Sequence, residues 1–286
     1  MLKNLQENID MNQKIKKILK LLNVIRSKKI IPIITPVDKD RILEGKVALI
    51  TGGSSGIGLA IADYFIKSGC KVVIAGTRKE KLDAAKNSIN NDNLATIVMD
   101  ITDVKSLSQK IDEAVSVFGK IDILVNSAGV HHTHGFEDIG EAEFDKIMDT
   151  NVKGTFYMSQ FMIKYMKKNK IHGHILNVSS SSALRPATGP YHMSKWAITG
   201  LTKGLAGLYF KDGIIINAIA PGQTATPMLN VDKNDDISNG YAFAGRYIMP
   251  EEIASLATMM VSSLGDMIVG DTYYMTGGSG VVTFEG

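Results

Sequence analysis

The chain has 286 residues, of which 44% are apolar and 21% charged, the composition of an ordinary globular protein with one large or two small domains. Cys70 is the only cysteine, which excludes an intrachain disulfide and a cysteine zinc cluster, and we expect it to be a small buried apolar residue. No apolar run reaches the roughly 18 residues of a membrane span. These features predict a cytoplasmic protein.

The first 42 residues differ from the rest in charge. They hold ten Lys or Arg against four acidic residues, a net charge of +6, and since the whole chain is +3, residues 43–286 carry −3. A mildly acidic main domain argues against a nucleic-acid partner. We therefore divide the chain into an N-terminal extension, residues 1–42, and a single main domain, residues 43–286.

Within the extension, apolar residues recur at helical spacing from residue 12 to about residue 29, with lysines mostly on the other faces. This pattern predicts a basic amphipathic helix, followed by an extended connector that contains Pro32 and Pro36. Packing on this subunit or a neighbouring one is the favoured role of the helix. Contact with an anionic membrane surface is the alternative.

In the main domain, apolar runs of strand length alternate with segments of helical period. The predicted strands are residues 47–50, 72–75, 95–99, 121–125, 175–178, 214–219 and 272–275. The predicted helices include residues 57–67, 104–118, 141–167, 194–210 and 250–263. Strands without polar alternation, separated by helices, predict a parallel sheet covered on both faces. We therefore expect an α/β fold, a Rossmann-type doubly wound sheet of seven parallel strands that binds ligands at the carboxyl ends of its strands.

A glycine-rich stretch, TGGSSGIG at residues 51–58, follows the first predicted strand and opens the first predicted helix. Gly52 can supply a backbone angle that is closed to other residues, Gly56 lets a pyrophosphate approach the backbone, and Gly58 lets the helix pack closely on the strand. A phosphate would then lie at the helix N-terminus, where free amides and the helix dipole favour an anion. A glycine turn that binds nothing is the alternative, so the motif depends on what accompanies it.

Tyr191 and Lys195 form a YxxxK motif. Residues four apart share one face of a helix, so the Lys195 ammonium can lie near the Tyr191 hydroxyl and is expected to lower its pKa, which is ordinarily about 10. Tyr191 would then serve as a general acid and base near neutral pH. The sequence NVSS at residues 177–180 ends one predicted strand, NSAG at residues 126–129 ends another, and Asn151 falls in a long predicted helix.

From residue 43 to about Gly278, these motifs and their order resemble the classical short-chain dehydrogenases/reductases. TGGSSGIG matches the cofactor turn of that family, NSAG its NNAG, YHMSK its YxxxK and Pro221-Gly222 the turn after its sixth strand. The resemblance implies that Tyr191 exchanges a proton with the substrate oxygen, while Ser180 hydrogen-bonds that oxygen. It also implies that Lys195 tunes Tyr191 and holds the nicotinamide ribose, and that Asn151 anchors a proton-relay water.

The same resemblance implies a site for a nicotinamide cofactor. Its residues are Gly52, Ser54, Ser55, Gly56, Ile57, Gly58, Thr77, Arg78, Asp100, Ile101, Asn126, Ala128, Gly129, Tyr191, Lys195, Pro221, Gly222, Thr224 and Thr226. The second predicted strand leads into Gly76-Thr77-Arg78-Lys79, where an NAD-binding turn would place an acidic residue. Gly76 leaves room there, and Arg78 can bind a 2′-phosphate through its planar guanidinium. NADP(H) is therefore favoured over NAD(H), with a solvated helix start at Arg78 and Lys79 as the alternative.

The chain departs from the family pattern at two places. Ser180 lies about two residues closer to the tyrosine than usual, so either the loop 181–190 is shortened or another serine of the run 179–182 serves. The NVSS alignment selects Ser180, with Ser179 second. Ser127 replaces the second asparagine of NNAG, a position that chiefly braces strands, and we expect little effect on function.

Histidines follow the NSAG segment at the expected rim of the site, namely His131, His132 and His134. No acidic or cysteine partner has convincing ligand spacing, so we expect no metal site and interpret these histidines as substrate contacts or solvated residues. His172, His174 and His192 are expected to be structural. Residues 228–249 cover the substrate by resemblance, and for Tyr241, Phe243, Tyr247 and Met249 ordinary packing and pocket lining are both open.

The favoured function is an NADP(H)-dependent oxidoreductase that interconverts a carbonyl and a secondary alcohol, most similar to the 3-oxoacyl-carrier-protein reductases. One alternative is an NAD(H)-dependent dehydrogenase of a sugar, polyol or steroid-like alcohol. Another is a non-catalytic, cofactor-binding regulatory protein. The expected partners are a small carbonyl or alcohol substrate and further copies of the chain in a homotetramer or homodimer, which the resemblance places on the long helices after Asn151 and Tyr191 and on the last strand.

Overall fold

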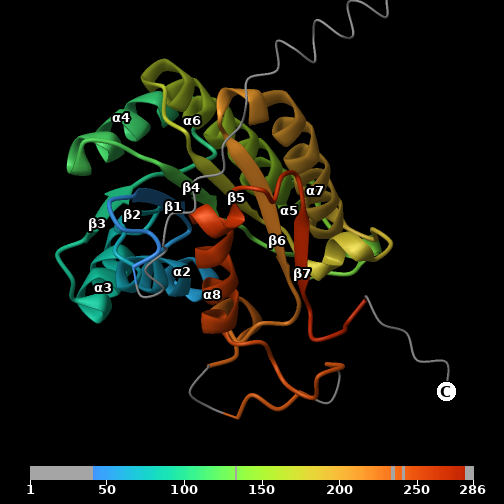
Figure 1. The fold of residues 1–286 in the computed structure, drawn as a ribbon. Coiled ribbons are helices and arrows are strands. Elements are labelled where there is room, and N and C mark those ends of the chain that lie inside the picture. The colour runs from blue at the N-terminus through green and yellow to red at the C-terminus, as the bar shows by residue number, and fades with distance from the viewer. Residues whose placement is uncertain (1–40, 133, 233–235, 240–241, 281–286) are drawn as a thin grey trace, which may run out of the picture. The chain divides into compact units, whose positions relative to one another are not determined.

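A computed structural model describes residues 41–280 apart from residues 133, 233–235 and 240–241 (Figure 1). The predicted helix at residues 12–29, its connector and Tyr241 lie outside the described residues. Within the described part, no helix has the length and apolar character that a bilayer span requires.

The described strands form one sheet in the order β3-β2-β1-β4-β5-β6-β7, and every neighbouring pair is parallel. The strands are β1 (Val47–Thr51), β2 (Lys71–Gly76), β3 (Leu94–Val98), β4 (Ile123–Asn126), β5 (His174–Val178), β6 (Ile215–Pro221) and β7 (Thr272–Met275). This arrangement confirms the predicted α/β fold with its doubly wound sheet of seven parallel strands.

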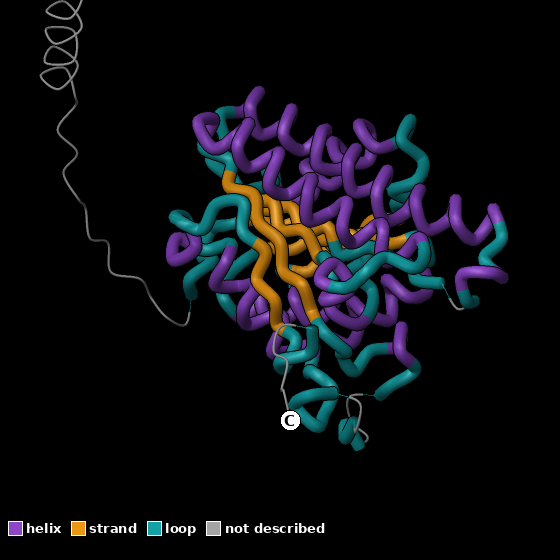
Figure 2. The backbone as a smooth tube through the Cα atoms, turned by 90° about the vertical axis from the view of Figure 1, so that its right-hand side faces the viewer, coloured by secondary structure: helices purple, strands orange, loops and turns teal. Residues whose placement is uncertain are grey.

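Helices cover both faces of the sheet (Figure 2). Their bounds are α2 (Gly56–Lys67), α3 (Lys79–Ile89), α4 (Leu107–Phe118), α5 (Glu141–Ile147), α6 (Thr155–Asn169), α7 (Pro190–Tyr209) and α8 (Pro250–Met260). One core cluster joins the sheet to α2, α3 and α8, and the other joins its opposite face to α4, α6 and α7. The domain is therefore a sheet between two helical layers.

The two cores explain why the strands lack polar alternation. In β1, Ala48 and Ile50 belong to one cluster, whereas Val47 and Leu49 belong to the other. Successive side chains of a strand point to opposite faces, so both sets must be apolar when both faces are covered. Cys70 is fully buried in the first cluster, and burial raises the pKa of its thiol to about 12, as expected for an inert apolar residue.

The structure changes two predicted helix boundaries near the candidate catalytic residues. The predicted helix 141–167 is interrupted between α5 and α6 by a π-helical segment, Met148–Gly154, which contains Asn151. The predicted helix 194–210 begins earlier, at Pro190, since proline suits the first turn of a helix, where its missing N–H leaves no bond unmade. Tyr191 therefore lies in the first turn of α7, near the carboxyl ends of the strands.

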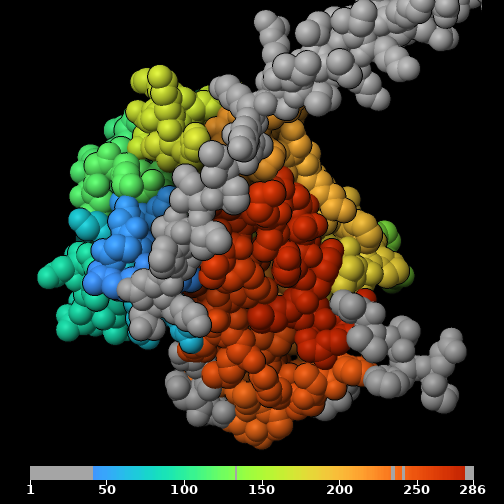
Figure 3. Space-filling model, viewed as in Figure 1, coloured from blue at the N-terminus to red at the C-terminus, as the bar shows by residue number. Residues whose placement is uncertain are grey.

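The order of the strands determines where a ligand can bind. The chain runs outward from β1 to β2 and β3 and then returns to the other side of β1 as β4, so the helices that follow β1 and β4 cover opposite faces. Thr51 and Asn126 are paired at the carboxyl ends of β1 and β4. Such a switch point leaves a crevice between the loops that leave the two strands. The later part of the chain, from β6 through α8 to β7, gathers in one region of the surface (Figure 3).

At the opposite end of the sheet, β5 begins with the buried His174, whose ring nitrogen Nε2 lies 3.3 Å from an Asp266 carboxylate oxygen. Burial lowers the pKa of His174 to about 4 from its usual 6.5, and Asp266 only partly opposes this effect. Between about pH 6.5 and pH 4, His174 is therefore protonated in the unfolded chain and neutral in the folded protein. The corresponding stability is present above about pH 6.5 and is lost as the pH falls towards 4.

We predict that lowering the pH from 7 to 4.5 removes about 2 kcal/mol more unfolding free energy from the unmodified protein than from His174→Gln. Urea unfolding at both pH values measures the difference. His172→Gln, which changes an exposed histidine two residues away, is the control and should keep the pH dependence of the unmodified protein. Equal acid sensitivity of His174→Gln and the unmodified protein would contradict the assignment.

Candidate active site

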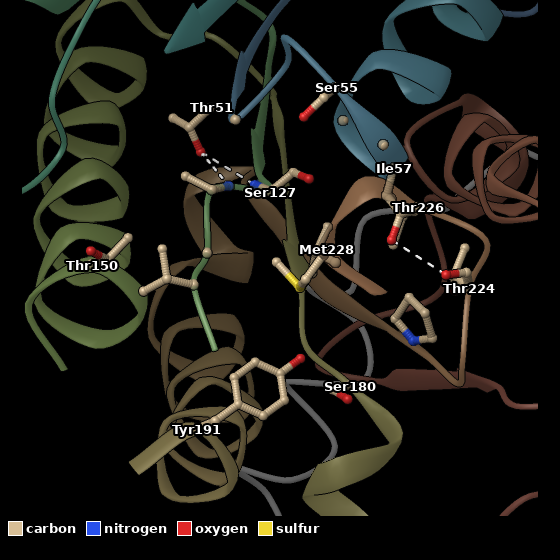
Figure 4. A pocket seen from close by; sticks show the side chains of 18 of the residues that line it. Thr51, Ser55, Ile57, Ser127, Thr150, Ser180, Tyr191, Thr224, Thr226 and Met228 are labelled. Atoms are coloured by element: carbon tan, nitrogen blue, oxygen red, sulfur yellow. Dashed lines mark hydrogen bonds between the residues drawn. The ribbon is translucent and has the colours of Figure 1, made fainter. Parts of the chain in front are cut away.

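A pocket of about 670 Å³ opens at the carboxyl ends of the strands (Figure 4). Every residue that the resemblance assigned to the cofactor lines it, except Asn126. Of the four predicted catalytic residues, Ser180, Tyr191 and Lys195 line the pocket, whereas Asn151 does not. The fold thus brings together motifs that lie as far apart in the chain as Gly52 and Thr226.

The glycine turn between β1 and α2 has the geometry that its sequence predicts. Gly52 has a φ of +65°, and a Cβ there would lie 2.7 Å from the Cα of Ala128. A Cβ on Gly58 would lie 2.5 Å from the carbonyl oxygen of Gly52. The sequence predicts that Gly58 allows close packing of the helix on the strand. In the structure it instead allows close packing on the turn at Gly52. α2 begins at Gly56, so its unpaired first amides lie at the pocket wall, where they can bind an anion.

The side chain of Thr51 holds the NSAG segment beside this turn. Its Oγ1 accepts hydrogen bonds from the backbone N–H groups of Ser127 and Ala128, each at 3.2 Å (Figure 4). Asn126 does not reach the pocket, because its amide nitrogen donates to Ser159 Oγ at 3.0 Å and to Asn177 Oδ1 at 2.9 Å. Asn126 therefore braces β4 against α6 and β5.

Tyr191 directs its hydroxyl into the pocket, on the side where Ser180 lies (Figure 4). Burial raises the pKa of the phenol above its usual 10, and a hydrogen bond with Ser180 opposes part of this rise. Lys195 is also buried, and burial lowers the pKa of its amine to about 8. Both shifts have the same cause, since removing water disfavours the charged form of each group.

The expectation that Lys195 lowers the pKa of Tyr191 is therefore wrong for this structure. The Lys195 Nζ donates to the carbonyl oxygen of Val178 at 2.9 Å and lies 5.5 Å from the centre of the Tyr191 ring. The ammonium thus lies over the ring face, and loss of hydration dominates the pKa of the phenol. Tyr191 is accordingly a protonated acid at neutral pH.

The Asn151 side chain does not line the pocket but bonds to residues around it. Its Oδ1 accepts from the backbone N–H of Val130 at 2.9 Å, and its Nδ2 donates to the carbonyl of Val130 at 2.9 Å and to Ser194 Oγ at 3.0 Å. Both hydrogens of the Nδ2 amide are therefore used in bonds within the protein. The side chain clamps the loop after β4 to α7.

The serines at the end of β5 take different positions. Ser179 donates to the carbonyl of Lys195 at 3.1 Å, and its Oγ lies 3.1 Å from the Thr199 hydroxyl. Ser180 interacts with the hydroxyl of Tyr191 and accepts from the N–H of Ser182 at 3.1 Å. The connection to α7 begins with a 3₁₀ turn, Ser181–Leu184.

Comparison with known proteins identifies relatives of this chain. The model of the short chain dehydrogenase family matches residues 46–236. The chain is 32% identical over 248 residues to 3β-hydroxysteroid dehydrogenase 2 of Eggerthella lenta, covering 83% of this chain and 95% of that protein. It is 32% identical over 243 residues to 2-dehydro-3-deoxy-D-gluconate 5-dehydrogenase of Dickeya dadantii, covering 82% and 96%. The chain belongs to the short-chain dehydrogenases.

Among solved structures, the 3-ketoacyl-(acyl-carrier-protein) reductase of Brucella melitensis, complexed with NADH, superposes with a TM-score of 0.77 at 33% identity. The alignment covers 84% of this chain and all of that one. The protein is therefore an NAD(P)-dependent oxidoreductase of the short-chain dehydrogenase family.

In this dehydrogenase, the two basic residues after β2 have different surroundings. Lys79 is the first residue of α3 and pairs with Asp83 at 2.7 Å, so it belongs to the solvated helix start. Arg78 lines the pocket and has no ion-pair partner among the described residues. A Cβ on Gly76 would lie 3.5 Å from Ser54 Oγ, an ordinary contact, so a side chain fits there.

The histidines at the rim form a packed group. The two ring nitrogens of His131 lie 2.7 Å from the carbonyl oxygen of His132 and 3.1 Å from that of Met228. His131 thereby links the loop after β4 to the loop 222–249, instead of being merely solvated.

The remaining histidines do not gather as metal ligands. His134 pairs with Glu143 at 2.8 Å, and the rings of His132 and His192 pack at 5.7 Å between their centres. Within the described residues, no three potential ligands cluster in a way that could hold a metal ion.

After β6, the pocket is lined in part by residues that the sequence did not single out. Met228 and Leu229 line the pocket, whereas Phe243, Tyr247 and Met249 do not, which favours ordinary packing for those three. Sequence reasoning also missed Val130, Lys146, Thr150, Arg185, Gln223 and Ser279. For Arg185 a signal was available, because a cation between Ser180 and the YxxxK motif falls beside the catalytic candidates. Lys146 and Ser279 carried no such signal.

We predict that Ser180→Ala lowers kcat about 10²–10³-fold, because a hydrogen bond to the reacting oxygen is lost. Ser179→Ala is the matched control and should mainly lower the unfolding free energy, by about 1 kcal/mol, through its buried hydrogen bonds. Steady-state reduction of a ketone probe and urea unfolding measure the two effects. The reverse pattern, with Ser179→Ala inactive and Ser180→Ala active, would assign the catalytic role to Ser179.

Proposed function

We propose that this short-chain dehydrogenase uses NADP(H) to interconvert a carbonyl and a secondary alcohol, with Tyr191 as the general acid and base and 3-oxoacyl thioesters as the first substrates to test. The observation that carries the proposal is the buried Tyr191 hydroxyl, which faces the pocket beside Ser180. The buried Lys195 lies over the face of the Tyr191 ring. Acid, hydrogen-bond donor and cation thus meet at one point of the pocket.

The pocket fits a dinucleotide, since the turn at Gly52 and Gly58 leaves no room for side chains and the first amides of α2 are available to a pyrophosphate. When bound, the nicotinamide cofactor supplies or accepts the hydride. Thr77 and Arg78 would hold the 2′-phosphate, and Lys195 the nicotinamide ribose. The other residues proposed to hold it are Ser54, Ser55, Gly56, Ile57, Asp100, Ile101, Ala128, Gly129, Pro221, Gly222, Thr224 and Thr226.

The raised pKa of Tyr191 suits the reductive direction. A protonated phenol can give its proton to the oxygen of the carbonyl as that oxygen gains negative charge, and Ser180 can donate a second hydrogen bond to it. In the oxidative direction Tyr191 must first lose its proton, which burial opposes and the hydrogen bond with Ser180 partly favours. The Asn151 main-chain carbonyl would hold the water that returns protons.

Two alternatives remain of interest. An NAD(H)-dependent dehydrogenase of a sugar, polyol or steroid-like alcohol is supported by the names of the sugar-acid and steroid relatives and by the NADH in the Brucella structure. A non-catalytic regulatory protein is disfavoured, because it would have no need of Ser180, Tyr191 and Lys195 around one pocket. A screen of carbonyl compounds and acyl thioesters that follows NADPH and NADH consumption separates these functions.

We also propose that copies of the chain associate as a homotetramer or homodimer in the cytoplasm. Apolar side chains are exposed on the elements concerned, with Phe156 of α6 40%, Leu208 of α7 68% and Tyr273 of β7 37% accessible. Burying them against a second copy would be favourable. Residues 1–42 would form an extension that is separate from the main domain, residues 43–286.

We predict that Tyr191→Phe lowers turnover about 10²–10⁴-fold, since the proton donor is removed while the ring remains. Cofactor affinity, measured by calorimetry, should be retained. Tyr209→Phe, at the other end of α7, is the matched control and should leave turnover unchanged. Unchanged turnover of Tyr191→Phe would contradict the mechanism.

A second prediction concerns the cofactor. Arg78→Ala should weaken NADPH selectively by about 1.5–3 kcal/mol, the value of a charged hydrogen bond, and Gly76→Asp should raise KM for NADPH while improving the use of NADH. Lys79→Ala is the control, because Lys79 is paired with Asp83. A preference of the unmodified protein for NADH, or equal weakening of both cofactors by Arg78→Ala, would show that Arg78 does not bind the phosphate.

A further inference from the structure

The pocket wall carries more positive than negative charge. Among the described residues that line it, the cations are Arg78, Lys146, Arg185 and Lys195, and the only carboxylate is Asp100. Arg78 and Lys195 have places in the proposed cofactor site. Asp100 accepts two hydrogen bonds from Thr102, at 2.9 and 2.8 Å, and its charge lies at the β3 end. The positive charges of Lys146 and Arg185 are therefore unexplained by the proposed function, and Arg185 is the one that lies beside Ser180 and Tyr191 in the chain.

Arg185 belongs to the connection between Ser180 and Tyr191, which places it at the end of the pocket where the carbonyl would react. Its main chain is held on both sides, because its N–H donates to the carbonyl of Ser182 at 3.3 Å and its carbonyl accepts from Trp196 Nε1 at 2.9 Å. The side chain runs toward the last described residues, where a Cβ on Gly280 would lie 3.6 Å from Arg185 Nε. The main chain of Arg185 is thus fixed by hydrogen bonds.

The Arg185 guanidinium has no anionic partner in the described part of the chain, residues 41–280 with their gaps. Within the described residues it forms no ion pair and no side-chain hydrogen bond, in contrast to Arg246, which makes a two-bond pair with Glu252 at 2.8 Å. Burial, followed by the charges of His132 and Arg185, lowers the pKa of the neighbouring His192. The charge at this end of the pocket is therefore positive.

The other residues around this end suit a small polar molecule. Ser181, Ser182 and Ser279 line the pocket with Arg185, and the apolar contribution comes from Met228 and Leu229 of the loop 222–249. Arg185 is exposed, and its planar guanidinium matches the paired oxygens of a carboxylate or phosphate. A neutral steroid-like substrate would gain nothing from this charge.

We propose that Arg185 is a specificity-determining residue that binds an anionic group, a carboxylate or a phosphate, on the carbonyl substrate. The proposal rests on the proposed function, in which Tyr191 and Ser180 engage the carbonyl oxygen. The substrate class is accordingly a ketone that carries its own carboxylate, or a thioester whose carrier supplies a phosphate.

Three probes that share one ketone test this assignment: acetoacetate, its neutral ethyl ester, and acetoacetyl-coenzyme A. For Arg185→Gln we expect kcat/KM to fall about 10- to 100-fold on an anionic probe and to change less than about threefold on ethyl acetoacetate. Loss on acetoacetate identifies a carboxylate, and loss on the thioester alone identifies a carrier phosphate. Arg185→Lys should recover part of the loss, and Lys86→Gln, which removes an exposed cation of α3, should lose nothing.

A merely structural role of Arg185 would lower kcat/KM on all three probes and would raise KM for the cofactor, so an equal loss on the neutral ester overturns the proposal. If none of the probes is reduced with NADPH or NADH, the proposed function fails on this class. Calorimetric titration of acetoacetate and ethyl acetoacetate into the protein with NADP⁺ then tests Arg185 by itself. Tighter binding of the anion that is lost in Arg185→Gln supports the proposal, and equal or absent binding of both compounds overturns it.

Discussion

The parallel pairing of β1 with β4 is the constraint on which the rest of the site depends. It brings Thr51 beside Asn126 at one edge of the sheet, and the Thr51 hydroxyl then holds the backbone of Ser127 and Ala128. The glycine turn and the NSAG segment become adjacent parts of one pocket wall because of this register. Since the helices after the two strands cover opposite faces, no element fills the crevice between them.

A buried polar network extends this arrangement to the catalytic side of the pocket. Asn126 bonds Ser159 and Asn177, and Asn177 in turn donates to Thr202 at 3.0 Å, which ties β4, β5, α6 and α7 together. Asn151 adds a clamp between the loop after β4 and Ser194. Asn126 Oδ1 is buried without a hydrogen-bond partner in the described residues, but the other bonds hold together the elements that carry Tyr191 and Lys195.

Burial, more than direct pairing, sets the electrostatics at Tyr191 and Lys195. Loss of water raises the pKa of the phenol and lowers the pKa of the amine to about 8, so both groups are drawn toward their neutral forms. Arg78 and Arg185 stand at two more open places of the same pocket and remain charged without protein partners among the described residues. The pocket therefore combines a dry reacting centre with cations that are free to bind the ends of its ligands.

The sequence by itself determined the seven-stranded parallel sheet, the glycine turn and the shared helix face of Tyr191 and Lys195, because these follow from hydrophobic periodicity and from spacings of a few residues. Only the tertiary structure decided the π-helical segment at Asn151, the rise in the pKa of Tyr191, the bond between His131 and Met228 and the place of Arg185 in the pocket. Each of these depends on atoms from distant parts of the chain, as in the contact that joins residues 97 positions apart. Local pattern fixes which way a side chain points along its own element, but burial and partners arise only when the elements pack.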